Sequence, residues 1–285
     1  MDAAIQSVAV VGAGFMGTGI AEAAAVAGLP VTVRDIDAAA LALAKERIER
    51  SIARGVEGGK LDASHAEVAL ARITLSTEWD ALAGAGLVIE AVSENLELKL
   101  AVMRSIDHVI DQHAIVASNT SSIPIAELAQ ALRRPERVIG LHFFSPVPVM
   151  TLVEVVVALD TSEATVEVAK AFVEQLGKRP IETKDRSGFI VNMLLVPYLM
   201  AAIRMLSDGY ANREDIDAGM RLGAGHPMGP LVLCDFIGLD VLYAVCDSLY
   251  DEYKRDEYAP PPLLKRMVAS GRLGRKSGRG FYDYP

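Results

Sequence analysis

Residues 5–35 read IQSVAVVGAGFMGTGIAEAAAVAGLPVTVRD. A β-branched apolar run leads into a glycine-rich turn of the form GxGxxG, and an alanine-rich helical segment and a second β-branched run follow. In such a turn the first glycine permits a tight bend, the second lets the backbone approach a pyrophosphate, and the third allows close packing of helix on strand. The free N–H groups and the dipole of the helix N-terminus favour that anion. The stretch predicts a dinucleotide-binding βαβ unit, whose candidate cofactor contacts in the turn are Gly12, Gly14, Phe15, Met16 and Gly17.

The acidic residue at the end of the second run indicates which dinucleotide binds. Asp35 lies 21 residues after Gly14, where a carboxylate accepts hydrogen bonds from the ribose hydroxyls and repels a 2′-phosphate. Its neighbour Arg34 is a complication, because an arginine here could pair with a 2′-phosphate. We therefore predict NAD as the cofactor, with NADP as the alternative that Arg34 leaves open.

Up to about Arg186 the sequence alternates short β-branched runs with longer helical segments. Strands are expected at residues 5–11, 31–34, 86–92, 115–118, 138–142 and 152–157, and helices at residues 15–27, 38–54, 97–110 and 163–176. Because the short runs are apolar on both faces, the pattern predicts a parallel sheet covered by helices on both sides. A charged segment at residues 58–71 extends the second helix into an expected helical hairpin, at about 38–71, outside the sheet.

After Gly188 the strand pattern stops. Helical segments are expected at residues 189–208, 215–222, 230–253 and 261–270, and the first is apolar nearly all round. A helix of that kind is normally buried in a core or in a subunit interface. The predicted fold class is α/β, a Rossmann-type doubly wound sheet domain followed by an all-α C-terminal domain. We place the NAD-binding domain at residues 1–186 and the helical domain at residues 187–285.

The composition excludes several classes of protein. The 285 residues are 51% hydrophobic and 23% charged, which is enough for a buried core and unlike a disordered chain. A net charge of −9 disfavours non-specific binding to nucleic acid or anionic membranes. Cys234 and Cys246 match neither a disulfide framework nor a metal site and are expected as buried thiols. Without a secretory signal or a membrane-spanning apolar run, we expect a cytoplasmic protein with no metal, nucleic-acid or membrane partner.

Among the five histidines, His142 is the best candidate for acid–base chemistry. It ends an apolar run, and ligands bind beyond the carboxyl ends of strands in open α/β sheets. Glu154 interrupts the next apolar run, where a carboxylate is costly unless it is paired. Two prolines between them suggest a turn that brings Glu154 beside His142, to fix the imidazole tautomer and stabilise the imidazolium. The alternative is a core histidine and a buried glutamate, each satisfied by the backbone.

Other polar residues allow more than one interpretation. The cluster at residues 118–122 is either a turn that caps the next helix or a group of hydroxyls and amides near a substrate oxygen. Asn192, alone in an apolar helical run, either bonds across the domain interface or faces the ligand. We expect His226 to help shape the cleft. The histidines expected to be solvated are His65, His108 and His113.

Longer motifs resemble a known family, the L-3-hydroxyacyl-CoA dehydrogenases, in particular their short monofunctional type that acts on 3-hydroxybutyryl-CoA. The strongest match is GLHFFSPVPVM at residues 140–150 with LVEV at residues 152–155. Supporting motifs are GAGFMG at 12–17, EAVSE at 90–94, ASNTSSI at 117–123, SGFIVNMLLVPY at 187–198, GAGHPMGP at 223–230 and GRGFY at 278–282. The resemblance extends over essentially the whole chain.

The resemblance implies NAD-dependent, reversible oxidation of (S)-3-hydroxyacyl-CoA to 3-oxoacyl-CoA. It implies that His142 is the general base and Glu154 its carboxylate partner, and that Ser121 and Asn192 hold the substrate oxygen. It also implies an acyl-CoA bound between the domains, with Arg54 and Lys60 as loose candidates on the hairpin, and a homodimer formed by the helical domain. The further cofactor contacts that it implies are Asp35, Glu94, Lys99 and Asn119.

One position departs from the family, and two rival functions stay open. Ser145 stands where the family usually has asparagine, which puts substrate preference and turnover in doubt but not the reaction class. The basic C-terminal stretch at residues 271–279 is expected to be a packed structural end. The rivals are a dehydrogenase of the same architecture that acts on a free sugar acid such as L-gulonate, and an NAD(H)-binding protein without catalysis. The Ser121, His142, Glu154 and Asn192 set argues against the second.

Overall fold

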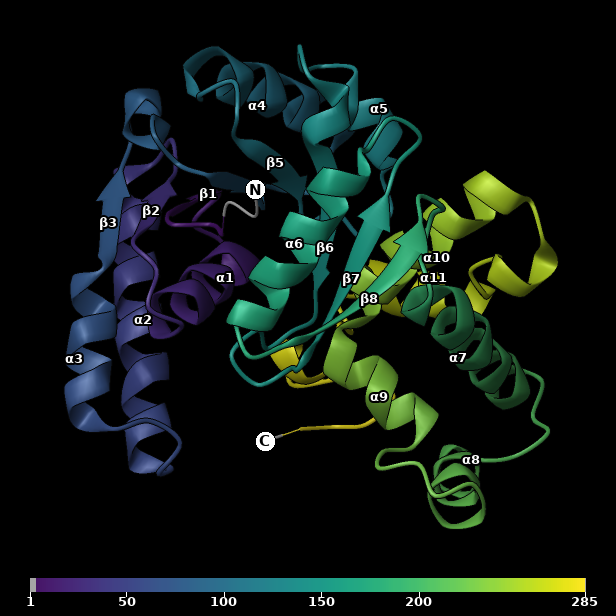
Figure 1. Ribbon diagram of the computed structural model, residues 1–285. Coiled ribbons are helices and arrows are strands. Elements are labelled where there is room, and N and C mark those ends of the chain that lie inside the picture. Colours follow the sequence, from purple (N-terminus) through teal and green to yellow (C-terminus); the bar gives the residue numbers. More distant parts are fainter. Residues whose placement is uncertain (1–3, 285) are drawn as a thin grey trace. The chain divides into compact units, whose positions relative to one another are not determined.

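The computed structural model describes residues 4–284 (Figure 1). The chain separates into two compact units, which divide between Asp185 and Arg186. The first unit contains the sheet and the second is helical. None of the helices in the described part of the chain is both long and apolar enough to cross a membrane.

The first unit is built on one eight-stranded sheet of order β3-β2-β1-β4-β5-β6-β7-β8. The strands from β3 to β6 are parallel, β7 runs antiparallel to β6, and β8 is parallel to β7. The chain order reverses around β1, which has β2 on one side and β4 on the other, and in open α/β sheets ligands bind at the carboxyl ends of the strands beside such a reversal. The strands are β1 Val8–Val11, β2 Val31–Arg34, β3 Ile73–Ser76, β4 Leu87–Glu90, β5 Ile115–Ser118, β6 Val138–Phe143, β7 Leu152–Val157 and β8 Arg179–Lys184.

The predicted fold class is confirmed, but β3 and β8 were missed and the sheet is not entirely parallel. Both missed strands lie at the edges of the sheet. Their residues are half-buried or exposed, so neither has the apolar character by which the central strands were found. β8 even contains Pro180, which an edge strand tolerates because one side of it makes no ladder hydrogen bonds.

Helices flank the sheet of the first unit. Ile20 of α1 and Phe172 of α6 belong to one apolar cluster, together with the strand residues that point to that side of the sheet. The two helices therefore cover the same face of the sheet (Figure 1). α2 and α3 form a hairpin beyond β2, and the side chain of Asp37 caps α2 by accepting a hydrogen bond from the amide of Ala39. The helices are α1 Phe15–Val26, α2 Ala38–Glu57, α3 Ala63–Ala71, α4 Leu96–Val109, α5 Ile125–Ala129 and α6 Glu163–Gln175.

The second unit is a set of helices around its own apolar core, which includes the buried Cys234 and Cys246 as free thiols. The expected helix at 230–253 is in fact two, because Gly238 has a φ of 99° and breaks it. The C-terminal stretch is packed, since the buried carboxylate of Asp235 accepts hydrogen bonds from the amides of Phe281 and Tyr282. The helices are α7 Val191–Ser207, α8 Arg213–Ala218, α9 Pro230–Ile237, α10 Leu239–Tyr253 and α11 Pro262–Ala269, with a π-helical turn at Gly219–Gly223.

Candidate active site

The turn between β1 and α1 has the space and the donors that a pyrophosphate needs. A Cβ on Gly12 would lie 2.6 Å from the carbonyl oxygen of Ala91, and one on Gly17 would lie 1.8 Å from that of Gly12, so both positions require glycine. Gly14 has open space instead, with nothing within 4 Å of such a Cβ. Within the described chain, no side chain caps α1 and its first turn holds no acidic residue, so the helix N-terminus can receive an anion.

Asp35 is fixed beside this turn by the backbone. Its Oδ2 accepts a hydrogen bond of 2.7 Å from the amide of Ala13, and its Oδ1 accepts one of 3.1 Å from the amide of Asp37. The carboxylate therefore stands at the end of β2, next to the glycine turn, with further lone pairs for the ribose hydroxyls of a dinucleotide. The turn and Asp35 together fit NAD.

The antiparallel pairing of β6 with β7 brings His142 and Glu154 together. The two residues are direct register partners, and the Nδ1 of His142 lies 2.6 Å from the Oε2 of Glu154. Glu154 is completely buried and His142 is 7% exposed, with the ring of Phe144 4.7 Å from the imidazole. The pairing that the two prolines suggested is therefore present, and the catalytic role of the pair stays a prediction.

This pair has the geometry of a general base. When Glu154 is ionised, the proton belongs on Nδ1, where it is shared with the carboxylate, and the lone pair is on Nε2. A carboxylate at Nδ1 holds the imidazole in that tautomer and stabilises the imidazolium that forms when Nε2 takes a proton. His142 lies at the carboxyl end of β6, on the edge of the sheet where ligands bind in this fold.

A network that the sequence analysis missed is centred on Glu90, the last residue of β4. Its carboxylate is fully buried, lies 2.7 Å from the Nζ of Lys99 and accepts a hydrogen bond of 2.6 Å from the hydroxyl of Ser118. Lys99 also contacts Glu94 at 3.2 Å. Glu90 could have been found by the reasoning used for Glu154, because it too is a carboxylate in an apolar strand and requires a partner.

Glu94 carries this network to the loop after β5. Its Oε1 accepts hydrogen bonds from the hydroxyl of Thr120 and from the amides of Ser121 and Ser122, at 2.5, 2.9 and 3.2 Å. Burial acts to raise the pKa of Glu94, but the charge of Lys99 and these hydrogen bonds outweigh it, so the pKa is lowered. An ionised Glu94 therefore holds Ser121 in place at physiological pH.

Comparison with known proteins assigns the chain to a family. Residues 7–186 match the NAD binding domain of 3-hydroxyacyl-CoA dehydrogenase, and residues 188–284 match its C-terminal domain. The chain belongs to the 3-hydroxyacyl-CoA dehydrogenase family. It is 49% identical to a 3-hydroxybutyryl-CoA dehydrogenase of Mycobacterium tuberculosis, with 100% of both chains covered. It is 43% identical to the human mitochondrial hydroxyacyl-coenzyme A dehydrogenase, with 98% of this chain and 91% of the human one covered.

Solved structures of the 3-hydroxyacyl-CoA dehydrogenase family match the whole chain. FadB2 of M. tuberculosis matches with a TM-score of 0.98 at 49% identity, over 99% of this chain and 100% of that one. The (S)-3-hydroxybutyryl-CoA dehydrogenase PaaH1 from Ralstonia eutropha matches with a TM-score of 0.94 at 46% identity, over the same shares of the two chains. The cofactor of the family is NAD, in agreement with the glycine turn and Asp35.

The remaining candidate residues lie at several places. The side chain of Asn119 accepts a hydrogen bond of 3.0 Å from the amide of Phe143, next to His142. Lys99 is 1% exposed, and its ammonium group contacts protein acceptors, so we interpret it as a residue that positions Glu94. Asn192 is the second residue of α7 in the helical unit. His65, His108 and His113 are exposed, as predicted.

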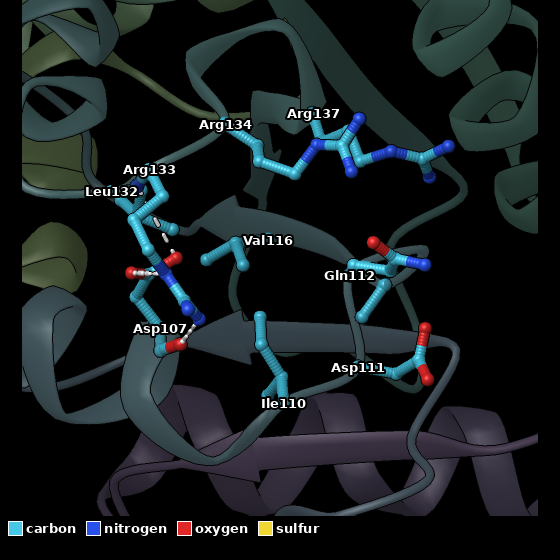
Figure 2. Close-up of a pocket in the computed structure, with 10 residues that line it drawn as sticks. Asp107, Ile110, Asp111, Gln112, Val116, Leu132, Arg133, Arg134 and Arg137 are labelled. Atoms are coloured by element: carbon cyan, nitrogen blue, oxygen red, sulfur yellow. Dashed lines mark hydrogen bonds and ion pairs between the residues drawn. The ribbon is translucent and has the colours of Figure 1, made fainter.

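A cavity of about 270 Å³ lies at the opposite end of the sheet, where the chain enters β5 and β6 (Figure 2). Three arginines line it, but Arg133 is paired with Asp107 at 2.7 Å, and Arg134 is paired with Glu136 at 3.1 Å. Because two of these three arginines are paired with carboxylates and the cavity is at the amino ends of the strands, it is not the predicted site. Within the described residues, no group of three His, Cys, Asp or Glu side chains could hold a metal ion.

Proposed function

We propose that this chain catalyses the reversible oxidation of (S)-3-hydroxybutyryl-CoA to acetoacetyl-CoA, with NAD taking the hydride. The observation that carries the proposal is the 2.6 Å contact between His142 and Glu154 at the carboxyl end of β6, in a chain with an NAD-binding turn. A relative that is 49% identical over the full chain bears the name 3-hydroxybutyryl-CoA dehydrogenase, and one that is 44% identical over 98% of the chain bears the name probable 3-hydroxybutyryl-CoA dehydrogenase, which supports this substrate.

In this proposal His142 takes the proton of the substrate hydroxyl on Nε2 when C3 is oxidised. NAD, when bound, would supply the hydride acceptor. Glu154 offsets the positive charge that forms on the imidazole, and it keeps Nε2 directed at the hydroxyl through the bond at Nδ1. In the reverse direction the same nitrogen returns the proton to the 3-oxo group.

Ser121 and Asn192 are the proposed partners of the substrate oxygen. The contacts from Glu94 fix the loop around Ser121, whose hydroxyl lies 3.4 Å from the same carboxylate oxygen and can turn towards a ligand. For Asn192, the second residue of α7, the proposal rests on the family resemblance alone. Groups that orient a substrate contribute to catalysis by lowering the entropy cost of the reaction.

We also propose a homodimer and a cytoplasmic location. Exposed apolar residues on α7 support the dimer, which would form through the helical unit as the family resemblance implies.

Two buried free thiols are typical of a reducing compartment, which supports the proposed cytoplasmic location.

The test is a steady-state assay of NADH oxidation with acetoacetyl-CoA, followed by a chain-length series of 3-hydroxyacyl-CoA substrates with NAD. We expect turnover with acetoacetyl-CoA and none with L-gulonate. Activity on the free acid without activity on the thioester would assign the chain to the sugar-acid type. Binding of NADH without turnover of either substrate would support a non-catalytic protein.

A further inference from the structure

The side chain of Arg34 is held by contacts to two nearby residues, Thr77 and Trp79. Arg34 ends β2, directly before Asp35, and successive side chains on a strand point to opposite faces. Its guanidinium carbon lies 3.7 Å from the centroid of the Trp79 ring, and its Nε donates a hydrogen bond of 3.2 Å to the carbonyl oxygen of Thr77. Only 8% of the residue is exposed. The cation nearest to Asp35 in sequence is therefore held by protein groups.

Both contacts come from residues 77–79, which we call the β3 turn because they follow β3 directly. β3 is parallel to β2 with Arg34 opposite Ser76, and the amide of Asp35 donates a hydrogen bond of 3.3 Å to the carbonyl oxygen of Ser76. The pairing of the two edge strands therefore places the β3 turn alongside Asp35, at the ribose end of the nucleotide site.

The β3 turn also contributes a carboxylate. The hydroxyl of Thr77 donates a hydrogen bond of 3.0 Å to Glu78. Burial lowers the pKa of Arg34, and the charges of Asp35 and Glu78 act in the opposite direction. Asp35 follows Arg34 in the chain, and Glu78 stands between Thr77 and Trp79, the two residues that contact the guanidinium group. A phosphate arriving here would face the negative charges of Asp35 and Glu78, and a cation already in contact with an aromatic ring and a backbone carbonyl.

We propose that the β3 turn enforces the preference for NAD over NADP, because Trp79 and the Thr77 carbonyl hold Arg34 away from the 2′ position while Glu78 adds a negative charge beside Asp35. A guanidinium stacked on a ring must give up that contact before it can pair with a phosphate. NADP has a 2′-phosphate that requires such a pairing, whereas NAD has a hydroxyl that Asp35 accepts. The proposal rests on the assignment of NAD to this site and not on the identity of the acyl substrate.

The experiment measures dissociation constants of NADH and NADPH by isothermal titration calorimetry, without any acyl-CoA. In Trp79→Ala, Arg34 is released, and we expect NADPH to bind about 3- to 30-fold more tightly, the range of a lost cation–π contact, with NADH binding unchanged. Trp79→Phe keeps an aromatic face and should stay close to the wild type. Trp79→Ala combined with Arg34→Ala should lose the gain, because the cation that pairs with the phosphate is gone.

Glu78→Gln provides a second test, which does not depend on whether Trp79→Ala folds. Glu78→Gln changes one exposed side chain, and it should also bind NADPH more tightly, with a larger effect at low ionic strength, where charges are less screened. The proposal is wrong if neither single variant changes the ratio of the two dissociation constants. It is also wrong if the double variant keeps the gain of Trp79→Ala. A wild-type chain that fails to bind NADH would contradict the cofactor assignment itself, whatever its activity on acyl-CoA.

Discussion

At the scale of single residues, His142 differs from the other histidines by its buried carboxylate partner. Glu154 is fully buried, so its negative charge is costly in the apolar strand unless the imidazole shares it. Two of the others contact neutral groups instead: His65 contacts the carbonyl of Val26, and His226 contacts the hydroxyl of Tyr198. We therefore expect acid–base chemistry at His142, the histidine that lies against a buried carboxylate.

Replacing His142 tests that role directly. We expect His142→Ala to lower kcat with acetoacetyl-CoA by about 10²- to 10⁴-fold, the usual contribution of a positioned acid–base group. The affinity for NADH should not change, because the glycine turn and Asp35 are untouched. Steady-state kinetics and a titration with NADH measure the two effects. His108→Ala, an exposed position on α4, is the control and should keep full activity; an undiminished kcat in His142→Ala would remove the residue from the reaction.

The sequence predicted the residues of this pair but not the network behind Ser121. Glu154 was recognisable because a carboxylate stood within an apolar run and two prolines suggested a reversal of the chain. Glu90 is likewise a carboxylate in an apolar strand, yet its partners Lys99 and Ser118 lie on two other elements. A single sequence does not reveal which of several nearby cations and hydroxyls will meet such a carboxylate, since that depends on how helix and strands pack.

At the scale of elements, buried strands were predictable and edge strands were not. β1, β2 and β5 are short β-branched runs that are buried along nearly their whole length, so their apolar character is visible in the sequence. β3 and β8 pair on one side only and are partly exposed, which allows polar residues in them. Their strand conformation comes from the neighbouring strand rather than from their own residues.

The contact between α1 and α2 predicts a pH dependence of stability. Glu22 on α1 is 6% exposed and accepts a hydrogen bond of 2.9 Å from Ser51 on α2. Burial raises its pKa from the ordinary 4.5 to about 7, against the opposing effects of Ser51, Arg54 and Lys178. Between these two pH values the folded state holds more protons at Glu22 than the unfolded state does. The contribution of this group to stability therefore falls as pH rises from 4.5 to about 7.

Glu22→Gln should remove this dependence, because the amide cannot ionise and can still accept the hydrogen bond from Ser51. We expect the variant to be more stable than the wild type by about 1–2 kcal/mol above pH 7, and to show little difference near pH 4.5. Urea unfolding over that pH range measures the difference. The exposed Glu49 on α2 supplies the control, Glu49→Gln, which should follow the wild type. A constant difference between Glu22→Gln and the wild type at all pH values would contradict the assignment.

At the scale of the whole molecule, the two units differ in how much their sequences reveal. β-branched runs stop after Lys184, and the contact pattern divides the chain between Asp185 and Arg186. The helical unit could be predicted as helical, but not the break at Gly238 or the π-helical turn after α8, because both depend on packing within the unit. An apolar helix also does not indicate by itself which of its residues stay outside the core.

α7 has an exposed apolar stripe, which is a candidate surface for assembly. Leu194 is 73% exposed and Met205 is 39% exposed, and the exposed Ala201 lies between them at helical spacing. The opposite side of α7 is in the core, where Leu199 and Ile203 are completely buried. A helix that is apolar on both sides gains from a second apolar surface, and a second copy of the same helix provides one.

Leu194→Glu should therefore weaken the proposed dimer. We expect the wild type to have the mass of two chains in size-exclusion chromatography with light scattering, and Leu194→Glu to have the mass of one at the same concentration, because a charge placed in an apolar interface must be desolvated without a partner. Leu159→Glu is the matched control: the same substitution at a leucine that is 93% exposed in the first unit should leave the dimer intact. A wild-type chain that stays monomeric at micromolar concentration would contradict the homodimer, and a dimeric Leu194→Glu would place its interface away from this face of α7.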